Sequence, residues 1–305
     1  MIRIITEDEL KELIVPMDRF IKWVEDVFQT QYDDAIQPTK IRMPIHQSDY
    51  FNVMPCVLPD CRYMGVKVVT RSEYRVKHGQ PTIDADILLY DYKTAELLAV
   101  MDGSYITTVR TAAVAVHSIL NLVSDYSTIS MVGLGRIGNS IADILFNKCK
   151  AKCLRVKLYN YKNYADKFIE KYSGFGNITF EKSNSYEDLM KDSDVIISAV
   201  SYIDGDFCHP DCYKKGCTVI PVHLRGFMDC DIEFDHIITS DMVSIQKFKN
   251  YPYMRKVTLI NDIIKGKECT REKVDDRVLV YNCGLAIYDI YFAAKMYEMY
   301  LNHCK

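Results

Sequence analysis

A glycine-rich turn between an apolar strand and a helix restricts the fold of this chain more than any other feature. Residues 128–133 read as a buried strand, the turn Gly133-Leu134-Gly135-Arg136-Ile137-Gly138 follows, and residues 137–147 have a helical pattern. In a G-x-G-x-x-G turn, the first glycine permits the tight turn. The second lets a pyrophosphate approach the backbone, and the third lets the helix pack on the strand. The sequence predicts a dinucleotide site here; a tight βα turn without a ligand is the alternative.

Strands and helices alternate on both sides of this turn. A long helix is expected over residues 104–122, strands over 155–160, 194–199 and 217–222, and a helix over 164–172. Alternating β and α units predict a doubly wound parallel sheet of the Rossmann type, covered on both faces. Residues 6–101 read instead as helices, one of them over residues 17–28, followed by strands. The strands are expected over residues 51–54, 63–70 and 83–90, with a hairpin near Asp91, which predicts a mixed, antiparallel region. The segment 284–302 reads as a final apolar helix.

The end of the second strand bears on which dinucleotide is bound. Sites for NAD usually carry an acidic residue about 20 residues after the glycines, where it binds the ribose. This chain has Asn160 there, followed by Tyr161 and Lys162. No carboxylate repels a 2′-phosphate, and Lys162 can pair with one, which favours NADP(H). The alternative is that Lys162 is a solvated surface lysine.

Composition excludes several classes of partner and site. The formal net charge is −3 with acids and bases interspersed, so nucleic acid and membrane surfaces are not expected partners. No apolar run approaches the roughly 18 residues of a membrane span, and the N-terminus turns acidic too early for a signal peptide, so we expect a cytoplasmic protein.

The cysteines indicate neither a disulfide scaffold nor a metal site. Eleven cysteines are too few for a disulfide scaffold in a chain of 305 residues. Cys208, His209, Cys212 and Cys217 have the chemistry of zinc ligands, but no second Cys-x-x-Cys pair completes a set, so no metal site is predicted.

The chain resembles the ornithine cyclodeaminase/mu-crystallin family in a segment M-D-G…R-T-[AG]-A. Further motifs of the family follow the same order along nearly the whole chain. They are Asn52-Val53-Met54-Pro55, Gly65-Val66-Lys67, Met101-Asp102-Gly103-Ser104, Val109-Arg110-Thr111-Ala112-Ala113, Gly133 to Gly138 and Asn282 to Asp289. The resemblance implies a homodimer and two domains. Residues 1–122 plus 281–305 would form a mixed α+β domain for substrate binding and dimerisation, and residues 123–280 the dinucleotide-binding domain.

The resemblance also places substrate cations at Arg42, Lys67 and Arg110. A substrate carboxylate needs fixed cations near the position of hydride transfer. Lys67 lies in a strand with Val66 and Val68 on the other face, and Arg110 lies on a helix among small residues. Arg42 follows a polar stretch, and its alternative is a plain surface charge. Lys67 is also a candidate catalytic residue.

The predicted cofactor site combines the glycine turn with residues from neighbouring segments. Its full set is Thr111, Gly133, Gly135, Arg136, Ile137, Gly138, Asn160, Lys162, Ala199 and Val200.

One departure from the family pattern concerns the chemistry. Cyclodeaminases carry an aspartate in a G-A-D segment after the fifth strand of the nucleotide domain. Here the matching stretch, residues 219–226, has His223, and Asp231 aligns with a later acidic position. A neutral imidazole accepts or donates a proton but offers no negative charge to an iminium. His223 therefore suits hydride transfer to an imine or keto acid, unless it merely closes the strand end.

The sequence is compatible with three functions. The first is an NAD(P)-dependent oxidoreductase acting on an amino acid, a keto acid or a cyclic imine, of the ketimine reductase, alanine dehydrogenase or opine dehydrogenase type. The second is an ornithine cyclodeaminase that uses bound NAD and releases ammonia. The third is a non-catalytic NADP-binding protein.

Overall fold

The computed structural model describes residues 2–46, 49–150 and 152–303. The chain divides into two compact units. The mixed-sheet unit comprises Met1–Arg110 and Gly284–Lys305, and the parallel-sheet unit comprises Thr111–Cys283. The division falls inside the long helix α4 (Gly103–Leu122), twelve residues before the boundary expected from the sequence. The predicted class, a doubly wound parallel sheet with a second mixed α+β domain, is confirmed.

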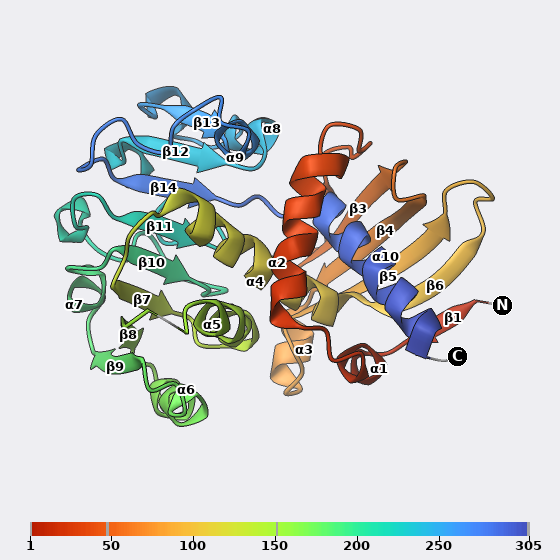
Figure 1. Cartoon of the computed structure of the whole chain (residues 1–305), viewed down its shortest axis with the longest axis horizontal. Helices are drawn as coiled ribbons and strands as arrows, with labels where there is room; N and C mark the ends of the chain where they lie inside the picture. Colours follow the sequence, from red (N-terminus) through yellow and green to blue (C-terminus); the bar gives the residue numbers. More distant parts are fainter. Residues whose placement is uncertain (1, 47–48, 151, 304–305) are drawn as a thin grey trace. The chain divides into compact units, whose positions relative to one another are not determined.

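The mixed-sheet unit is built on six strands in the order β1-β6-β5-β4-β3-β2 (Figure 1). Neighbouring strands are antiparallel except for β1 and β6, which are parallel. The strands are β1 (Arg3–Ile5), β2 (Ile41–Pro44), β3 (Tyr50–Leu58), β4 (Tyr63–Arg71), β5 (Ile83–Asp91) and β6 (Leu97–Asp102). The helices of this unit, besides the start of α4, are α1 (Glu7–Glu12), α2 (Met17–Asp26), the π-helix η1 (Val27–Gln31), α3 (Glu73–Lys77) and α10 (Ala286–His303).

The C-terminal helix α10 covers one face of this sheet. Figure 1 shows α10 lying across β3, β4 and β5, which are the strands it contacts. Gly65 permits this approach, because a Cβ at this position would stand 2.6 Å from the carbonyl oxygen of Leu88 and 2.9 Å from a side-chain carbon of Ile290. The residues of α10 from Ala286 to Ala294 are buried on all sides, which explains why the segment reads as apolar without a polar face.

The parallel-sheet unit has eight strands in the order β13-β12-β14-β11-β10-β7-β8-β9, all parallel. They are β7 (Thr128–Val132), β8 (Leu154–Tyr159), β9 (Ile178–Ser183), β10 (Val195–Ser198), β11 (Thr218–Pro221), β12 (His236–Thr239), β13 (Val257–Leu259) and β14 (Val278–Tyr281). β7, β10 and β11 are buried at every residue, as expected for a sheet with both faces covered.

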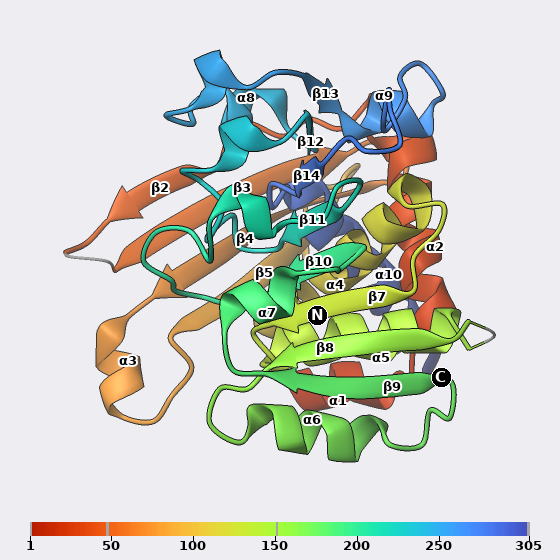
Figure 2. The same ribbon diagram turned by 90° about the vertical axis from the view of Figure 1, so that its left-hand side faces the viewer.

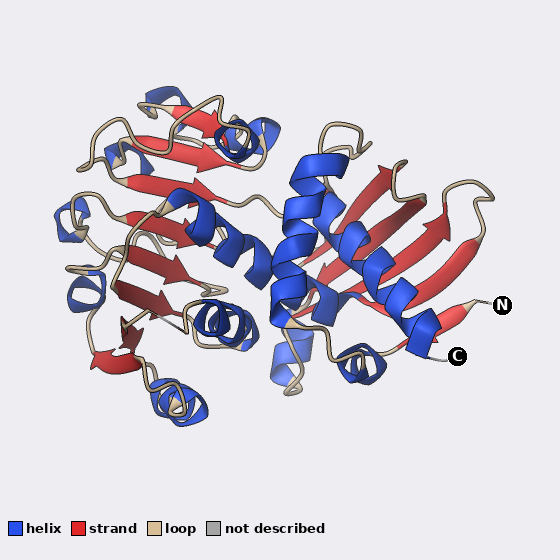
Figure 3. Ribbon diagram, viewed as in Figure 1, coloured by secondary structure: helices blue, strands red, loops and turns tan. Residues whose placement is uncertain are grey.

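Helices lie on both faces of this parallel sheet, as Figures 2 and 3 show. In Figure 2, α7 lies on one side of β7, β8 and β9, and α5 lies on the other. The helices are α5 (Arg136–Lys148), α6 (Tyr164–Tyr172), α7 (Tyr186–Met190), α8 (Met242–Ile245) and α9 (Ile260–Ile264). Three short 3-10 helices complete the unit: η2 (Pro210–Cys212), η3 (Asp231–Glu233) and η4 (Tyr251–Tyr253).

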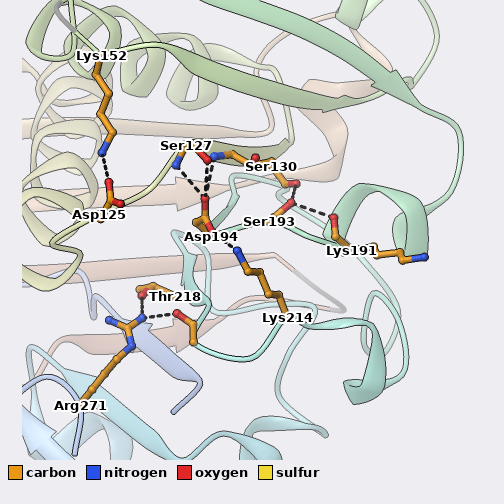
Figure 4. A network of polar contacts seen from close by, with 12 residues as sticks. Asp125, Ser127, Ser130, Lys152, Lys191, Ser193, Asp194, Lys214, Thr218 and Arg271 are labelled. Atoms are coloured by element: carbon orange, nitrogen blue, oxygen red, sulfur yellow. Dashed lines mark hydrogen bonds and ion pairs between the residues drawn. The ribbon is translucent and has the colours of Figure 1, made fainter. Parts of the chain in front are cut away.

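A polar network closes the amino edge of the parallel sheet (Figure 4). Asp194, just before β10, accepts hydrogen bonds from the backbone N–H groups of Ser127 and Thr128, both at 2.9 Å, and pairs with Lys214. Arg271 donates to the carbonyl oxygen of Gly216 at 2.8 Å. Burial raises the pKa of Asp194, but Lys214 and the two N–H groups outweigh it, and the net shift is downward. The network thus links the amino-terminal ends of β7, β10 and β11, at the edge of the sheet opposite to the glycine turn.

Most predicted elements of the sequence agree with the structure to within a few residues. The strand expected over residues 51–54 is longer, because β3 continues through Pro55. β2 pairs only with residues 50–53 of β3, so Pro55 has β4 alone as a neighbour and its missing N–H leaves no ladder bond unmade. The helix expected over residues 17–28 is α2 followed by the π-helix η1. Among the described residues, no helix combines the length and apolarity needed to cross a membrane.

Candidate active site

A buried ion-pair cluster lies between α10 and the sheet of the mixed-sheet unit. The Nζ atom of Lys67, on β4, lies 2.6 Å from Oδ2 of Asp289, on α10. The Nε atom of Arg110, on α4, donates to Oδ1 of the same carboxylate at 2.8 Å. Lys67 Nζ also donates to the hydroxyl oxygen of Thr107 at 3.4 Å. The side chains of Lys67 and Asp289 are 2% and 0% exposed, so these charges interact in a dry interior.

Burial is the largest influence on the ammonium of this cluster. It lowers the pKa of Lys67 to about 8, because an ammonium loses hydration in the interior. The Asp289 carboxylate opposes that effect, whereas Arg110 and Lys40 add to it. Two cations and one carboxylate leave the cluster with one positive charge while Lys67 is protonated. Such a cluster can bind a carboxylate, and Lys67 can exchange a proton near neutral pH.

The third predicted substrate cation, Arg42, lies on the same face of the sheet as Lys67. Arg42 is directly opposite Asn52 on β3, and Met54, two residues further, is opposite Lys67. Because directly paired residues share a face, these side chains leave the sheet on one side. Arg42 is exposed, and its guanidinium carbon lies 4.1 Å from the ring centroid of Tyr50. The structure thus joins Lys67 and Arg110 through Asp289 but does not bring Arg42 into that cluster.

The glycine turn of the parallel-sheet unit has the geometry of a phosphate-binding turn. Gly133 has φ +87°, and a Cβ there would stand 2.4 Å from the backbone of Ala199. A Cβ on Gly138 would stand 2.2 Å from the carbonyl oxygen of Gly133, so this glycine lets α5 pack on β7. A Cβ on Gly135 would meet no atom within 4 Å. The backbone at Gly135, which precedes the first residue of α5, is therefore open to a ligand at the helix N-terminus.

Four other predicted cofactor residues lie near this turn, and the position of a fifth, Thr111, is on α4. Ala199 and Val200 follow β10, and both approach Gly133. Arg136 and Ile137 begin α5. Thr111 is the first residue of the parallel-sheet unit and is buried on α4.

The end of β8 carries the residues predicted to bind the ribose. The side-chain N–H of Asn160 donates to Oδ1 of Asn184 at 3.0 Å. Lys162 is exposed, with its Nζ atom 5.1 Å from the ring centroid of Tyr161. This end of β8 carries no carboxylate, as the sequence indicates.

His223 follows β11, at the carboxyl edge of the parallel sheet, where the glycine turn also lies. The side chain is partly exposed. Asp231 is instead buried; it accepts a hydrogen bond from Asn250 at 2.8 Å and one from Tyr281 at 3.5 Å. Its place in this packed network is that of a structural acid. Among the described residues, no group of three or more His, Cys, Asp or Glu side chains is arranged to hold a metal ion.

Sequence reasoning misses the contacts of Asp289. This residue lies 179 positions after Arg110, and no local pattern links the two. One signal was available, because Asp289 is an acidic residue within the otherwise apolar segment from Ala286 to Ala294. A charge in a fully buried helix needs a partner of opposite charge.

Comparison with known proteins agrees with the resemblance noted in the sequence. A model of the ornithine cyclodeaminase/mu-crystallin family matches residues 4–204, which is more than half of the chain. The chain belongs to the ornithine cyclodeaminase/mu-crystallin family.

Among its relatives is a Delta(1)-pyrroline-2-carboxylate reductase of Bacillus thuringiensis. The two are 25% identical over 284 residues, which cover 87% of this chain and 86% of the relative.

Two solved structures share the fold over nearly the full length. An archaeal alanine dehydrogenase, a dimer with bound NAD, superposes with a TM-score of 0.85 at 22% identity, covering 100% of this chain and 97% of that one. The Delta(1)-pyrroline-2-carboxylate reductase of Thermococcus litoralis, in complex with NADH and L-proline, superposes with a TM-score of 0.83 at 23% identity, covering 99% and 98%. At these identities the likeness establishes the fold.

Proposed function

We propose that this protein is an NAD(P)-dependent oxidoreductase that acts on an amino acid, a keto acid or a cyclic imine. The observation that carries the proposal is the buried cluster of Lys67, Arg110 and Asp289, whose net positive charge suits a small carboxylate, in a chain that also has an open glycine turn. The relative from Bacillus thuringiensis, named as a reductase of a cyclic imino acid, supports this substrate class. A cytoplasmic location stays a prediction.

The residues of the parallel-sheet unit fit a dinucleotide. Gly135 and the N-terminus of α5 would hold the pyrophosphate, and the bound nicotinamide would supply or accept the hydride. We further propose a preference for NADP(H), supported by the lack of a carboxylate at the end of β8 and by the exposed ammonium of Lys162. Equal affinity for NAD(H) and NADP(H) would refute this preference.

Four side chains have proposed roles in the reaction. Lys67 and Arg110 would bind the substrate carboxylate, and Lys67 would hold or exchange a proton because its pKa lies at about 8. His223 would donate a proton to the imine nitrogen or the carbonyl oxygen as the hydride arrives. Arg42 would bind substrate from β2, where it lies opposite Asn52 of β3.

The outer face of the six-stranded sheet supports the proposal of a homodimer. One row of directly paired residues crosses five strands on the face opposite to α10: Ile4, Val100, Leu88, Val66 and Pro55. Every member is apolar, and Ile4 is 74% exposed. Next to this row Ile41, Met43 and Phe51 are exposed as well. An apolar face of this extent is typical of a protein interface, and a second copy of the chain offers the same surface.

Light scattering on the intact protein tests the dimer. We expect a dimer for the native chain and a monomer for Val66→Lys, which places a charge in the centre of the face. A native monomer at micromolar concentration would contradict the proposal.

Net turnover of the cofactor tests the proposed function. Purified protein is incubated with a panel of amino acids, keto acids and cyclic imines, with NAD(H) and NADP(H), while reduced cofactor and ammonia are measured. An oxidoreductase changes the cofactor in proportion to substrate, a cyclodeaminase releases ammonia from ornithine without net cofactor change, and a binding protein does neither. Either of the last two results would overturn the proposal.

A further inference from the structure

One carboxylate, Asp289, holds two of the three predicted substrate cations, Lys67 and Arg110. Its two oxygens take different partners: Oδ2 lies 2.6 Å from Nζ of Lys67, and Oδ1 accepts from Nε of Arg110 at 2.8 Å. The partners come from β4 and α4, and Asp289 comes from α10. Three separate elements of the chain therefore meet at one fully buried carboxylate.

The mode of contact with Arg110 leaves the far side of its guanidinium for another ligand. Asp289 engages Nε, and among the described residues the two Nη atoms make no hydrogen bond or ion pair. Gly284 lies beside these Nη atoms and has no side chain to cover them, whereas a Cβ at this position would stand 3.5 Å from Nη2. A guanidinium with both Nη groups available binds a carboxylate through two parallel hydrogen bonds.

We propose that Asp289 is the positioning residue of this site. Its two oxygens hold the Lys67 ammonium and the Nε group of Arg110, so that both cations face the same substrate carboxylate. Asp289 itself touches neither substrate nor cofactor. This inference rests on the proposed function, and it adds that the site takes a substrate with one carboxylate here.

Charge balance supports this role. With Asp289 ionised and both cations protonated, the cluster has one net positive charge, and a substrate carboxylate neutralises it. Without Asp289 the two cations would repel each other in a dry interior and move apart. The groups that face the Lys67 ammonium are Asp289, Arg110, Lys40 and the Thr107 hydroxyl, and Asp289 alone among the charged ones favours its protonation.

The test compares Asp289→Asn with Asp289→Glu and a control. Asp289→Asn keeps the shape and removes the charge, and Asp289→Glu keeps the charge and moves it. Asp26→Asn is the control, because Asp26 accepts a 3.4 Å hydrogen bond from Tyr291 of the same helix as Asp289 and contacts neither cation. Each variant is assayed for kcat and KM over a range of pH, and for binding of pyrrole-2-carboxylate, a planar carboxylate that cannot be reduced, by calorimetry.

A positioning role predicts a particular pattern of results. In Asp289→Asn, kcat falls at least ~100-fold, as expected for misplaced reacting groups, while pyrrole-2-carboxylate still binds, because the Arg110 guanidinium keeps its charge. The Lys67 pKa in the pH profile shifts down by roughly 1–3 units, since its one opposite charge is lost. Asp289→Glu restores the pKa but only part of kcat, and Asp26→Asn behaves as the native protein.

Several results would overturn the inference. They are an unchanged kcat or pH profile in Asp289→Asn, loss of pyrrole-2-carboxylate binding in the folded Asp289→Glu variant, or an equal loss in Asp26→Asn. Should Asp289→Asn not fold, NMR titration of Lys67 in the native and Asp289→Glu proteins decides whether the carboxylate sets its pKa. Because pyrrole-2-carboxylate binding and this titration need no turnover, a failure of the proposed function is distinguishable from a failure of the inference.

Discussion

Replacing Lys67 with methionine should change how the stability of the protein depends on pH. The pKa of a lysine is 10.5 in a model compound and about 8 for the buried Lys67. Between these two values the unfolded chain holds a proton that the folded protein has released, so stability rises with pH. This difference between the two pKa values corresponds to about 3 kcal/mol in the free energy of unfolding. A methionine side chain has no proton to release, so the Lys67→Met variant lacks this contribution.

The assay is denaturant unfolding of both proteins between pH 7.5 and 10.5, the range given by these two pKa values. Tyrosines and cysteines also titrate in this range, but they are common to both proteins and cancel in the difference. The free energy of unfolding of the native protein, minus that of Lys67→Met, should increase by about 3 kcal/mol as pH rises. A difference that stays flat or falls would refute the buried, destabilised ammonium.

Three further predictions concern other parts of the chain. Gly135→Val should abolish cofactor binding in a titration while circular dichroism stays native, because the added side chain meets only the open space where the cofactor would lie. Gly138→Ala should instead lower the melting temperature, because its Cβ would stand 2.2 Å from the carbonyl oxygen of Gly133. Intact cofactor binding by Gly135→Val would exclude the turn as the site. His223→Ala should lower kcat by roughly 10²–10⁴-fold if this side chain donates the proton, and an unchanged kcat would leave it a structural role. Burial lowers the pKa of His117 to about 4, so stability should fall by about 3 kcal/mol as pH drops from 6.5 to 4, because only the unfolded chain takes up the proton. In His117→Gln that fall should be smaller; an equal fall would assign it to other groups.

The parallel sheet could be predicted because its signals are local. The strand before Gly133, the glycines and the helix after them lie within 20 consecutive residues, and each restricts the next. Burial of β7, β10 and β11 at every residue produces the continuous apolar runs that identify such strands. The sequence does not predict β9, β12, β13 and β14. The last three have three or four residues each, and so short a strand gives little pattern. β9 is an edge strand in which buried and exposed residues do not alternate regularly, so it has neither a continuous apolar run nor a clear period.

The candidate site could be predicted only in part. Lys67 and Arg110 were identified through motifs, and the structure places them on one carboxylate. The sequence does not identify their partner, Asp289, because the contact between β4 and the C-terminal helix α10 depends on tertiary packing of segments far apart in the chain. The sequence predicts the same role for Arg42, which lies on the edge strand β2 and stacks on Tyr50, and that role stays a prediction.

Transfer of deuterium from the cofactor tests the central claim most directly. Reduced cofactor that is deuterated at the transferring carbon is incubated with the protein and a cyclic imino acid such as Delta(1)-pyrroline-2-carboxylate, and the product is analysed by NMR. The proposed function predicts an amino acid with deuterium at its α-carbon, formed in equal amount to the oxidised cofactor. Product without deuterium, or ammonia released from ornithine with no net oxidation of the cofactor, would contradict it.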